Sequence, residues 1–464
     1  MSFISPEFIC LFIFCFLLYH LTRGKSRKTV LLVTSGVFIG YFHWEFLLIA
    51  LSISLLTYNA GLLLEKVRPK NKSTQTVYWT ALACLLLCWT GFRHAESLTG
   101  NASLLFPLGL SFYTFQAIAY LTEVYWEETP AERNLPDFLL YMLLFMKFLS
   151  GPIERPNDLL PQIKKLHPAS YDMMTYGLKL IAIGLIKKLI IADHLAPHID
   201  EIFQAVHTAS GAQLIMAALL YPIELYADFS GYTDIAIGCA MLFGLRLSPN
   251  FERPFTAQTI TDFWRRWHIS LSSWVRDYLY LPLTSVTRRL GQTGIAISLI
   301  ITFVALGIWH GVGWNFVIYG LIQGIVIVWE QNTTSIRKTI SRRIGSPLYG
   351  LLAAIRTYLI FAFSLIFFKA KNMDDAVYFI RHLSFQTHSN WKEIDLGISD
   401  HICIVTGIAL LLIGIYEYFM ARTDLLRQIE KQPAVVRWSI YYLTAFLILA
   451  YGQFGSENFI YLQF

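Results

Sequence analysis

Long apolar runs separated by short polar segments extend along the whole chain. A helix that crosses a membrane needs about 20 predominantly apolar residues, and runs near this length recur from one end of the sequence to the other. They occupy residues 6–22, 29–43, 46–64, 78–92, 103–124, 173–192, 211–226, 232–245, 294–309, 313–330, 349–368, 401–420 and 436–453. The pattern predicts an all-α polytopic membrane protein with a helix at each of these positions.

One interruption of the pattern lies near residue 150. Residues 138–149 are apolar but short and contain Lys147, and Gly151-Pro-Ile-Glu-Arg-Pro156 follows. Two prolines, a glycine and two charges cannot continue a helix that faces lipid. We expect a break or a re-entrant segment here. Lys147, Glu154 and Arg155 either form a buried ion pair that orders the break or line a substrate channel.

A second interruption covers residues 261–283. Four charged residues and a histidine exclude a membrane span: Arg265, Arg266, His268, Arg276 and Asp277. An apolar stripe at helical spacing is formed by Trp267, Leu271, Trp274 and Tyr278, and a neighbouring face by Trp264, His268 and Ser272. The spacing predicts one amphipathic helix that is buried in the protein or lies at the membrane interface.

Composition supports membrane insertion. Hydrophobic residues make up 55% of the 464 residues and charged residues only 15%, against about 25% charged in ordinary soluble domains. The net charge of +6 comes from basic residues in short loops, which is typical of membrane orientation and not of nucleic-acid binding. The basic loops 23–28, 66–72, 337–343 and 421–437 should be cytoplasmic, which puts the N-terminus outside.

Neither a metal site nor a second domain is indicated. The six cysteines are scattered through apolar runs without a paired C-x-x-C spacing, so we expect no bound metal. A signal peptide would carry its positive charge before the first apolar run, and here the charge follows it. No repeat, soluble-domain boundary or low-complexity tract occurs. We expect a single integral-membrane domain, 1–464, with roughly 11 to 13 membrane helices, counting re-entrant or interfacial segments.

His310 is the strongest candidate for chemistry. It lies between two predicted spans in Gly307-Ile-Trp-His-Gly-Val-Gly-Trp314, where the glycines allow close backbone approach. A buried imidazole without a carboxylate nearby in sequence is expected to stay neutral, as a general base requires. The alternative is a packed histidine bonded to a helix backbone. His268 is the second polar centre, with an interfacial anchoring helix as its alternative.

Asp228, Ser230 and Asp234 lie in Tyr226-Ala-Asp-Phe-Ser-Gly-Tyr-Thr-Asp234. The segment does not match the G-x-S-x-G elbow of serine hydrolases, because no glycine stands two positions before the serine. We therefore do not expect Ser230 to be a nucleophile. The three residues are expected to form structural hydrogen bonds to broken helix ends.

These motifs together resemble the membrane-bound O-acyltransferase family, and most of all its bacterial alginate O-acetyltransferase branch, which is related to the membrane protein of teichoic-acid D-alanylation. The motifs that carry the resemblance occur in one collinear order: Phe106-Pro-Leu-Gly-Leu-Ser-Phe-Tyr-Thr-Phe-Gln116, Gly151-Pro-Ile-Glu-Arg155, Tyr226–Asp234, Asn250-Phe251, Phe263-Trp-Arg-Arg-Trp-His-Ile-Ser-Leu271, Trp274-Val-Arg-Asp-Tyr278, Gly307-Ile-Trp-His-Gly311 and Asn458-Phe-Ile-Tyr-Leu-Gln-Phe464. Leu281-Pro-Leu-Thr-Ser285 departs from the pattern, since relatives often carry two glycines after the Pro-Leu pair.

The resemblance implies a ring of tilted and broken helices around a central tunnel. His310 matches the family's catalytic histidine and His268 its second characteristic histidine. The motif core, residues 226–315, supplies the candidate supporting residues. These are Trp309, Asn315, Asp228, Ser230, Asp234, Trp264, Arg265, Arg266, Arg276 and Asp277. His268, the Trp309 N–H and Asn315 are alternative partners for the oxyanion.

The resemblance also implies a function. A small acyl group, most simply acetyl, would pass from a cytoplasmic thioester (acetyl-CoA or an acyl carrier) to a hydroxyl for O-acetylation of a cell-envelope polysaccharide or peptidoglycan. No cofactor would be bound. Expected partners are membrane lipid and a periplasmic or extracellular acceptor or transferase protein, without nucleic acid, at the bacterial inner membrane. The alternatives are D-alanyl transfer to teichoic acid and a non-catalytic transporter of envelope precursors.

Overall fold

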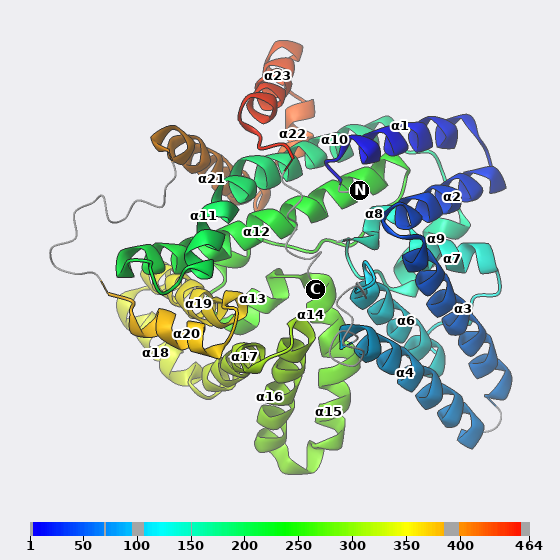
Figure 1. The fold of residues 1–464 in the computed structure, drawn as a ribbon, viewed down its shortest axis with the longest axis horizontal. Helices are drawn as coiled ribbons and strands as arrows, with labels where there is room; N and C mark the ends of the chain where they lie inside the picture. Colours follow the sequence, from blue (N-terminus) through cyan, green and yellow to red (C-terminus); the bar gives the residue numbers. More distant parts are fainter. Residues whose placement is uncertain (1–2, 69–70, 95–105, 150, 385–398, 456–464) are drawn as a thin grey trace. The chain divides into compact units, whose positions relative to one another are not determined.

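The computed structural model describes residues 3–68, 71–94, 106–149, 151–384 and 399–455, and within these ranges every regular element is a helix (Figure 1). The chain divides into two compact units. The first contains the residues up to Gly184 together with Tyr232–Ser248. The second contains Leu185–Gly231 and the residues from Pro249 to Ser456.

The first unit is built from helices that alternate with tight turns. They are α1 (Pro6–Leu21), α2 (Lys25–Phe42), α3 (Trp44–Val67), α4 (Asn71–Arg93), α6 (Leu110–Tyr125), α7 (Leu135–Leu143), α8 (Phe145–Phe148), α9 (Pro156–Lys164) and α10 (Tyr171–Leu185). Helix α3 packs against both α4 and α6, and α2 packs against α1, α3 and α7. Local sequence sets several helix starts: the Ser5 hydroxyl accepts the Phe8 N–H and the Asn134 side chain accepts the Asp137 N–H.

The predicted break near residue 150 is present, since α8 ends at Phe148 and α9 begins at Pro156. Lys147 is buried and donates to the Gln116 side chain and the Met142 carbonyl. Glu154 is also buried and accepts the Ser248 N–H at 2.6 Å. Burial raises the pKa of Glu154 to about 7 and lowers the pKa of Lys147 to about 7, and each charge offsets part of the other's desolvation. Both interpretations of the break, a buried ion pair and the lining of a substrate channel, stay predictions.

The second unit begins with a π-helix and contains the candidate site. Its elements are η1 (Ile186–Ala192), α11 (Asp193–Gln204), the part of α12 (Gly211–Leu242) up to Gly231, η2 (Pro254–Thr256), α13 (Ile260–Arg266), α14 (Ile269–Val275), η3 (Arg276–Tyr280), α15 (Leu281–Val286), η4 (Arg288–Leu290), α16 (Gly291–His310), α17 (Trp314–Asn332), α18 (Thr334–Ile344), α19 (Ser346–Lys369), α20 (Met373–Arg381), α21 (Asp400–Met420), α22 (Leu425–Glu430) and α23 (Ala434–Tyr451). Helices α16 and α17 pack along each other, and α17 also packs on α19.

The division of residues 211–245 into two spans was wrong. Residues 211–242 form one continuous helix, α12, and Ser230 and Gly231 lie within it. A glycine costs a helix only about 1 kcal/mol relative to alanine. Breaking the helix in an apolar surrounding would leave backbone N–H and C=O groups without partners at a higher cost. Asp228, Ser230 and Asp234 therefore do not stand at broken helix ends.

The single amphipathic helix predicted over residues 261–283 was also wrong. Helix α13 ends at Arg266, α14 begins at Ile269, and the π-helix η3 follows from Arg276. His268 has a left-handed backbone, with φ of 43°, in the intervening turn. The stripe of Trp267, Leu271, Trp274 and Tyr278 is consequently not the face of one helix. The segment matches no helix long and apolar enough to cross a membrane, as predicted.

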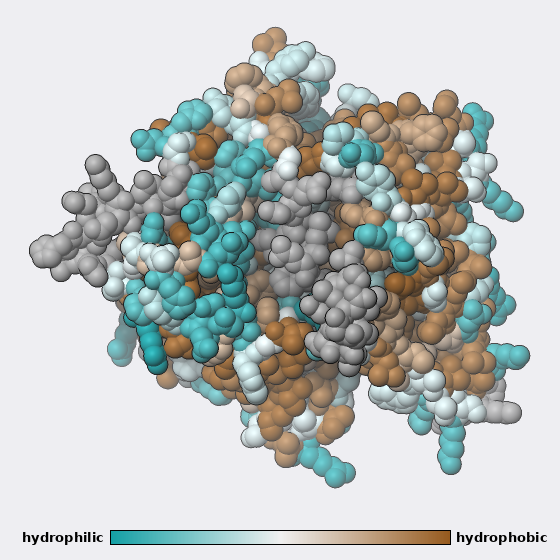
Figure 2. All heavy atoms as spheres, viewed as in Figure 1, coloured by the Kyte–Doolittle hydropathy of each residue, from teal (hydrophilic) through white to brown (hydrophobic). Residues whose placement is uncertain are grey.

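Seven described helices are long and apolar enough to cross a membrane. They are Trp44–Val67, Lys72–Arg93, Gly211–Leu242, Arg288–His310, Ser346–Lys369, Asp400–Met420 and Ala434–Tyr451. The shorter α1 is also apolar. Apolar residues lie on the surface over α1, α2 and α16 (Figure 2). These features confirm an all-α polytopic membrane protein. The single domain and the larger helix number stay predictions.

Several smaller expectations have clear outcomes. The basic segment around residues 337–343 is not a loop but the helix α18. The polar segment after α19 contains the short helix α20. Residues 385–398 and the motif Asn458–Phe464 lie outside the described residues.

Candidate active site

His310 is the last residue of α16, at the point where α16 turns into α17. The two helices approach closely because glycines face each other's backbone. A Cβ on Gly307 would lie 2.2 Å from the Phe316 carbonyl oxygen, and one on Gly320 would lie 2.1 Å from that of Phe303. Real Cβ atoms do not approach so closely, so only glycine fits. The predicted close backbone approach beside His310 is confirmed for Gly307.

Aromatic rings surround the His310 imidazole, which is only 3% exposed. The neighbouring Trp309 ring lies 4.6 Å away between centroids. Phe368 of α19 and Tyr319 of α17 meet the imidazole edge-on at 5.1 and 5.8 Å. Three helices therefore hold one imidazole in a predominantly apolar pocket.

His268 lies in the turn between α13 and α14 and is 1% exposed. Its Nδ1 atom is 3.1 Å from the side-chain oxygen of Asn250. The same oxygen accepts the Ser270 backbone N–H at 3.2 Å and the Ser270 hydroxyl at 2.9 Å. The Ile269 N–H donates to the Asn250 backbone carbonyl at 2.9 Å. Asn250 thus holds the left-handed turn that interrupts residues 261–283.

These contacts define which ring nitrogen of His268 carries hydrogen. A backbone N–H can only donate, so the Ser270 contact identifies the Asn250 atom as the amide oxygen, which can only accept. Nδ1 of His268 must then be protonated, and in the neutral ring Nε2 is the basic nitrogen. Burial lowers the pKa of His268 well below its ordinary value, and the nearby His310 lowers it further. The two histidines thus interact electrostatically, and His268 is a neutral ring with a defined tautomer.

Two further candidates, Trp264 and Asn315, tie the surrounding helices together. The Trp264 indole N–H donates to the Gln323 side chain at 3.1 Å, and Gln323 donates to the Ser364 hydroxyl at 2.7 Å. The Asn315 amide donates to the carbonyls of Phe367 and Ala370. Trp264 therefore links α13 to α17 and α19, and Asn315 links the start of α17 to the end of α19.

The charged candidates of this region lie nearer the surface. Arg265 is exposed. Arg266 pairs with Asp262 at 3.0 Å, one helical turn away. Arg276 pairs with the neighbouring Asp277 at 2.7 Å, and the Arg276 side chain is largely exposed. These contacts place the four residues in surface ion pairs and solvent.

Asp228 belongs to a buried ion triad. The Lys188 amine lies 2.6 Å from Asp228 and 2.7 Å from Asp193, and all three side chains are at most 2% exposed. Lys188 and Asp193 are five residues apart across η1, and a π-helix brings residues at this spacing together. The expectation that Asp228 bonds to a helix end is corrected to an ion pair. Ser230 is buried and Asp234 half-buried farther along α12.

Asn250 and Lys188 were not among the predicted site residues. Asn250 appeared only as part of a motif, and Lys188 lay unnamed within the predicted span 173–192. The five-residue spacing of Lys188 and Asp193 was a usable signal, whereas nothing local points from Asn250 to His268. Among the described residues no three His, Cys, Asp or Glu side chains are arranged to hold a metal ion.

Comparison with known proteins places these features in a family. The sequence model described as MBOAT, membrane-bound O-acyltransferase family, matches residues 12–369. The protein named "Probable alginate O-acetylase AlgI" of Azotobacter vinelandii is 33% identical over 93% of this chain and 86% of its own length. A peptidoglycan O-acetyltransferase of Helicobacter pylori is 35% identical over 59% of this chain and 56% of its own. A teichoic acid D-alanyltransferase of Streptococcus thermophilus is 29% identical over 53% and 62%.

The family match contains both histidines, the Lys188 triad and all the helices that surround His310. The family description and the two relatives named as acetyl-transferring enzymes favour an O-acyltransferase over a non-catalytic transporter. The chain therefore belongs to the membrane-bound O-acyltransferase family and is a multi-pass membrane O-acyltransferase.

Proposed function

We propose that this O-acyltransferase moves an acetyl group from a thioester donor to a hydroxyl acceptor for O-acetylation of a cell-envelope polysaccharide or peptidoglycan. The names of two relatives support acetyl as the group: an alginate O-acetylase similar over most of the chain, and a peptidoglycan O-acetyltransferase similar over more than half. The observation that carries the proposal is the buried pair His268 and His310, which interact inside the family's matched region.

In the proposed reaction, His310 takes the proton of the acceptor hydroxyl as its oxygen attacks the thioester carbonyl. The new C–O bond forms, the C–S bond breaks, and the proton leaves with the thiolate sulfur. General-base assistance of this kind contributes about 10²–10⁴-fold. The aromatic walls around His310 exclude water, which favours transfer to the acceptor over hydrolysis.

The tautomer of His268 supports an acceptor role. With Nδ1–H directed to Asn250, the Nε2 atom offers a lone pair and no hydrogen. We assign Nε2 of His268 to accepting, and thereby orienting, a hydrogen of the acceptor hydroxyl or of His310. This argues against His268 as a donor to the oxyanion. The side-chain amide of Asn315 already donates to two backbone carbonyls. The Trp309 N–H, beside His310, is therefore the remaining oxyanion candidate among the three.

The direction of transfer rests on the charge pattern of the loops. We propose a cytoplasmic donor, acetyl-CoA or an acyl carrier, and an acceptor or partner transferase on the outer side of the bacterial inner membrane. The N-terminus would face outward. A tunnel between the two sides would bring the reactants together, and proximity would then contribute to the rate.

D-Alanyl transfer to teichoic acid is the second candidate. Teichoic acid D-alanyltransferases of Streptococcus thermophilus and Bacillus subtilis are similar to this chain. Their identity is lower, 28–29%, and covers only 52–53% of the chain. Acetyl transfer is favoured because the alginate O-acetylase similarity extends over 93%.

The test uses full-length protein in detergent with radiolabelled acetyl-CoA and an envelope fraction. We expect label transfer by the native protein and its loss in His310→Gln, because glutamine cannot take up a proton. His401→Gln, at an exposed position of α21, is the matched control and should transfer label normally. Equal transfer by His310→Gln would refute the assignment of the base. Transfer only from a D-alanyl carrier protein would support the second candidate instead.

A further inference from the structure

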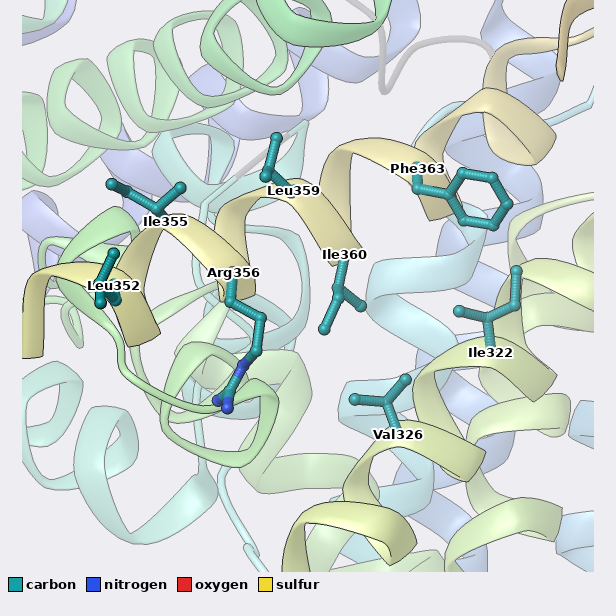
Figure 3. A pocket seen from close by; sticks show the side chains of 8 residues that line it. All are labelled: Ile322, Val326, Leu352, Ile355, Arg356, Leu359, Ile360 and Phe363. Carbon is teal, nitrogen blue, oxygen red and sulfur yellow. The ribbon is translucent and has the colours of Figure 1, made fainter. Parts of the chain in front are cut away.

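A shallow apolar groove lies between α17 and α19 in the second unit (Figure 3). It encloses about 540 Å³. Ile322 and Val326 of α17 form one side, and Leu359, Ile360 and Phe363 of α19 form the other. One charged side chain, Arg356, extends into it from α19 (Figure 3).

The groove is open to the surroundings of the protein. Leu359 and Phe363 are 47% and 42% exposed, although α19 is among the helices apolar enough to cross a membrane. In a bilayer this surface meets hydrocarbon, so a groove of this kind accommodates an acyl chain without losing hydrogen bonds.

Arg356 lies beside the last turn of α17, and Leu352 and Ile355 extend the lining of the groove one further turn along α19. Its guanidinium pairs with Glu330 at 3.2 Å and donates to the Gln258 carbonyl at 2.8 Å. It also lies over the ring of Trp329. Trp329 stands in the last turn of α17, and tryptophan side chains near a helix end are typical of the level of the lipid headgroups.

Helix α18 lies at this same end of α17, between α17 and α19. The Arg337 guanidinium donates to the Glu330 carbonyl, and α18 packs against both neighbouring helices. Ile336, Ile340 and Ile344 form an exposed apolar stripe along α18, with Ile336 59% exposed. The helix also carries four basic residues and no acidic one: Arg337, Lys338, Arg342 and Arg343. An apolar stripe beside basic residues is typical of a helix that lies in an anionic membrane surface.

We propose that the α17–α19 groove and α18 together form a binding site for an anionic phospholipid. An acyl chain lies along the groove, and the phosphate lies toward the basic side chains of α18. Glu330 balances the charge of Arg356, so the surplus positive charge is that of α18. This surplus favours an anionic headgroup over a zwitterionic one, by roughly a factor of five for each nearby basic residue. The site is independent of the acyl-transfer chemistry.

Binding is measured by native mass spectrometry of the full-length, delipidated protein in detergent. Phosphatidylglycerol and phosphatidylcholine with identical acyl chains are titrated separately. The test variant is Lys338→Gln/Arg342→Gln/Arg343→Gln, whose three side chains are exposed, so the fold should be retained. The control, Lys165→Gln/Arg288→Gln/Arg289→Gln, removes the same net charge at exposed positions elsewhere. Leu359→Trp narrows the groove and leaves every charge in place.

We expect one tightly bound phosphatidylglycerol, a preference over phosphatidylcholine, and a loss of at least about tenfold in that preference in the α18 variant. The control should keep the preference, and Leu359→Trp should weaken both lipids. Equal binding of the two lipids, or equal loss in the control, would overturn the proposal. Tight binding of glycerol phosphate, which has no acyl chain, would contradict the role of the groove.

Discussion

Nδ1 of His268, in the buried turn that joins α13 to α14, lies 3.1 Å from the side-chain oxygen of Asn250, which precedes α13 in the chain. Because the oxygen also accepts the Ser270 N–H, it can only accept from His268. Asn250 thereby sets the tautomer of the ring that interacts with His310. It acts as a positioning residue, in the way that outer partners orient metal-binding histidines elsewhere.

Replacing Asn250 should change activity through His268. Asn250→Leu removes the acceptor of the His268 and Ser270 hydrogens, and we expect acetyl transfer to fall by about 10–100-fold, as for other orienting partners. Asn250→Asp keeps an acceptor but adds a negative charge beside Nδ1, which raises the pKa of His268. The acid limb of its pH–rate profile should move to higher pH. A purely structural role predicts lower protein yield with an unchanged profile in the surviving protein.

Stability should depend on pH through His268. Its pKa in the folded protein lies below the ordinary value near 6.5 because the ring is buried. On acidification, the unfolded chain binds this proton before the folded protein does, so stability is lost as the pH falls below about 6.5. By pH 5 the loss is at most about 2 kcal/mol for one group.

The comparison that isolates this effect is thermal unfolding in detergent from pH 7.5 to 5. His268→Gln cannot titrate at this position and should show a flatter decline than the native protein. His401→Gln, at an exposed position, should decline as steeply as the native protein. Parallel curves for the native protein and His268→Gln would contradict the neutral, buried state of His268.

Glycine at position 307 should be required for the contact between α16 and α17. A Cβ there would meet a backbone carbonyl at 2.2 Å, which a side-chain rotation cannot relieve. Gly307→Ala should destabilise the protein by about 1–3 kcal/mol, as overpacking does, and should displace His310. Gly407→Ala in α21 meets nothing within 4 Å and should be neutral or stabilising by up to about 1 kcal/mol from helix propensity. Thermal unfolding of the two variants provides the test, and equal melting temperatures would refute it.

The free energy of unfolding should fall when the Lys188 triad loses its lysine and keeps both carboxylates. Lys188→Met leaves the buried Asp193 and Asp228 carboxylates without their cation, which should cost about 3–5 kcal/mol. Adding Asp193→Asn and Asp228→Asn to Lys188→Met should restore much of that stability. Arg427→Gln, which breaks an exposed pair with Asp424, should cost less than about 1 kcal/mol. The prediction is wrong if Lys188→Met unfolds no earlier than Arg427→Gln.

The local pattern of apolar and polar residues was sufficient to predict the helices whose two ends are set by their own sequence. The runs at 349–368, 401–420 and 436–453 correspond closely to α19, α21 and α23, because a span depends on the length of an apolar segment and on its own backbone hydrogen bonds. The same local logic predicted the break after Lys147 and the close approach at Gly307. The local pattern failed at α12, because Ser230-Gly231 was interpreted as the end of a helix.

The sequence by itself determined the membrane class of this protein, several of its spans and the choice of His310, since each rests on neighbouring residues or on motif order. Only the tertiary structure decided what surrounds the chemistry. The tautomer of His268 depends on Asn250, which is distant along the chain, and the state of Asp228 depends on Lys188. The partners of a buried polar group are the groups that tertiary packing places beside it. The hydropathy of a segment does not indicate which groups these are.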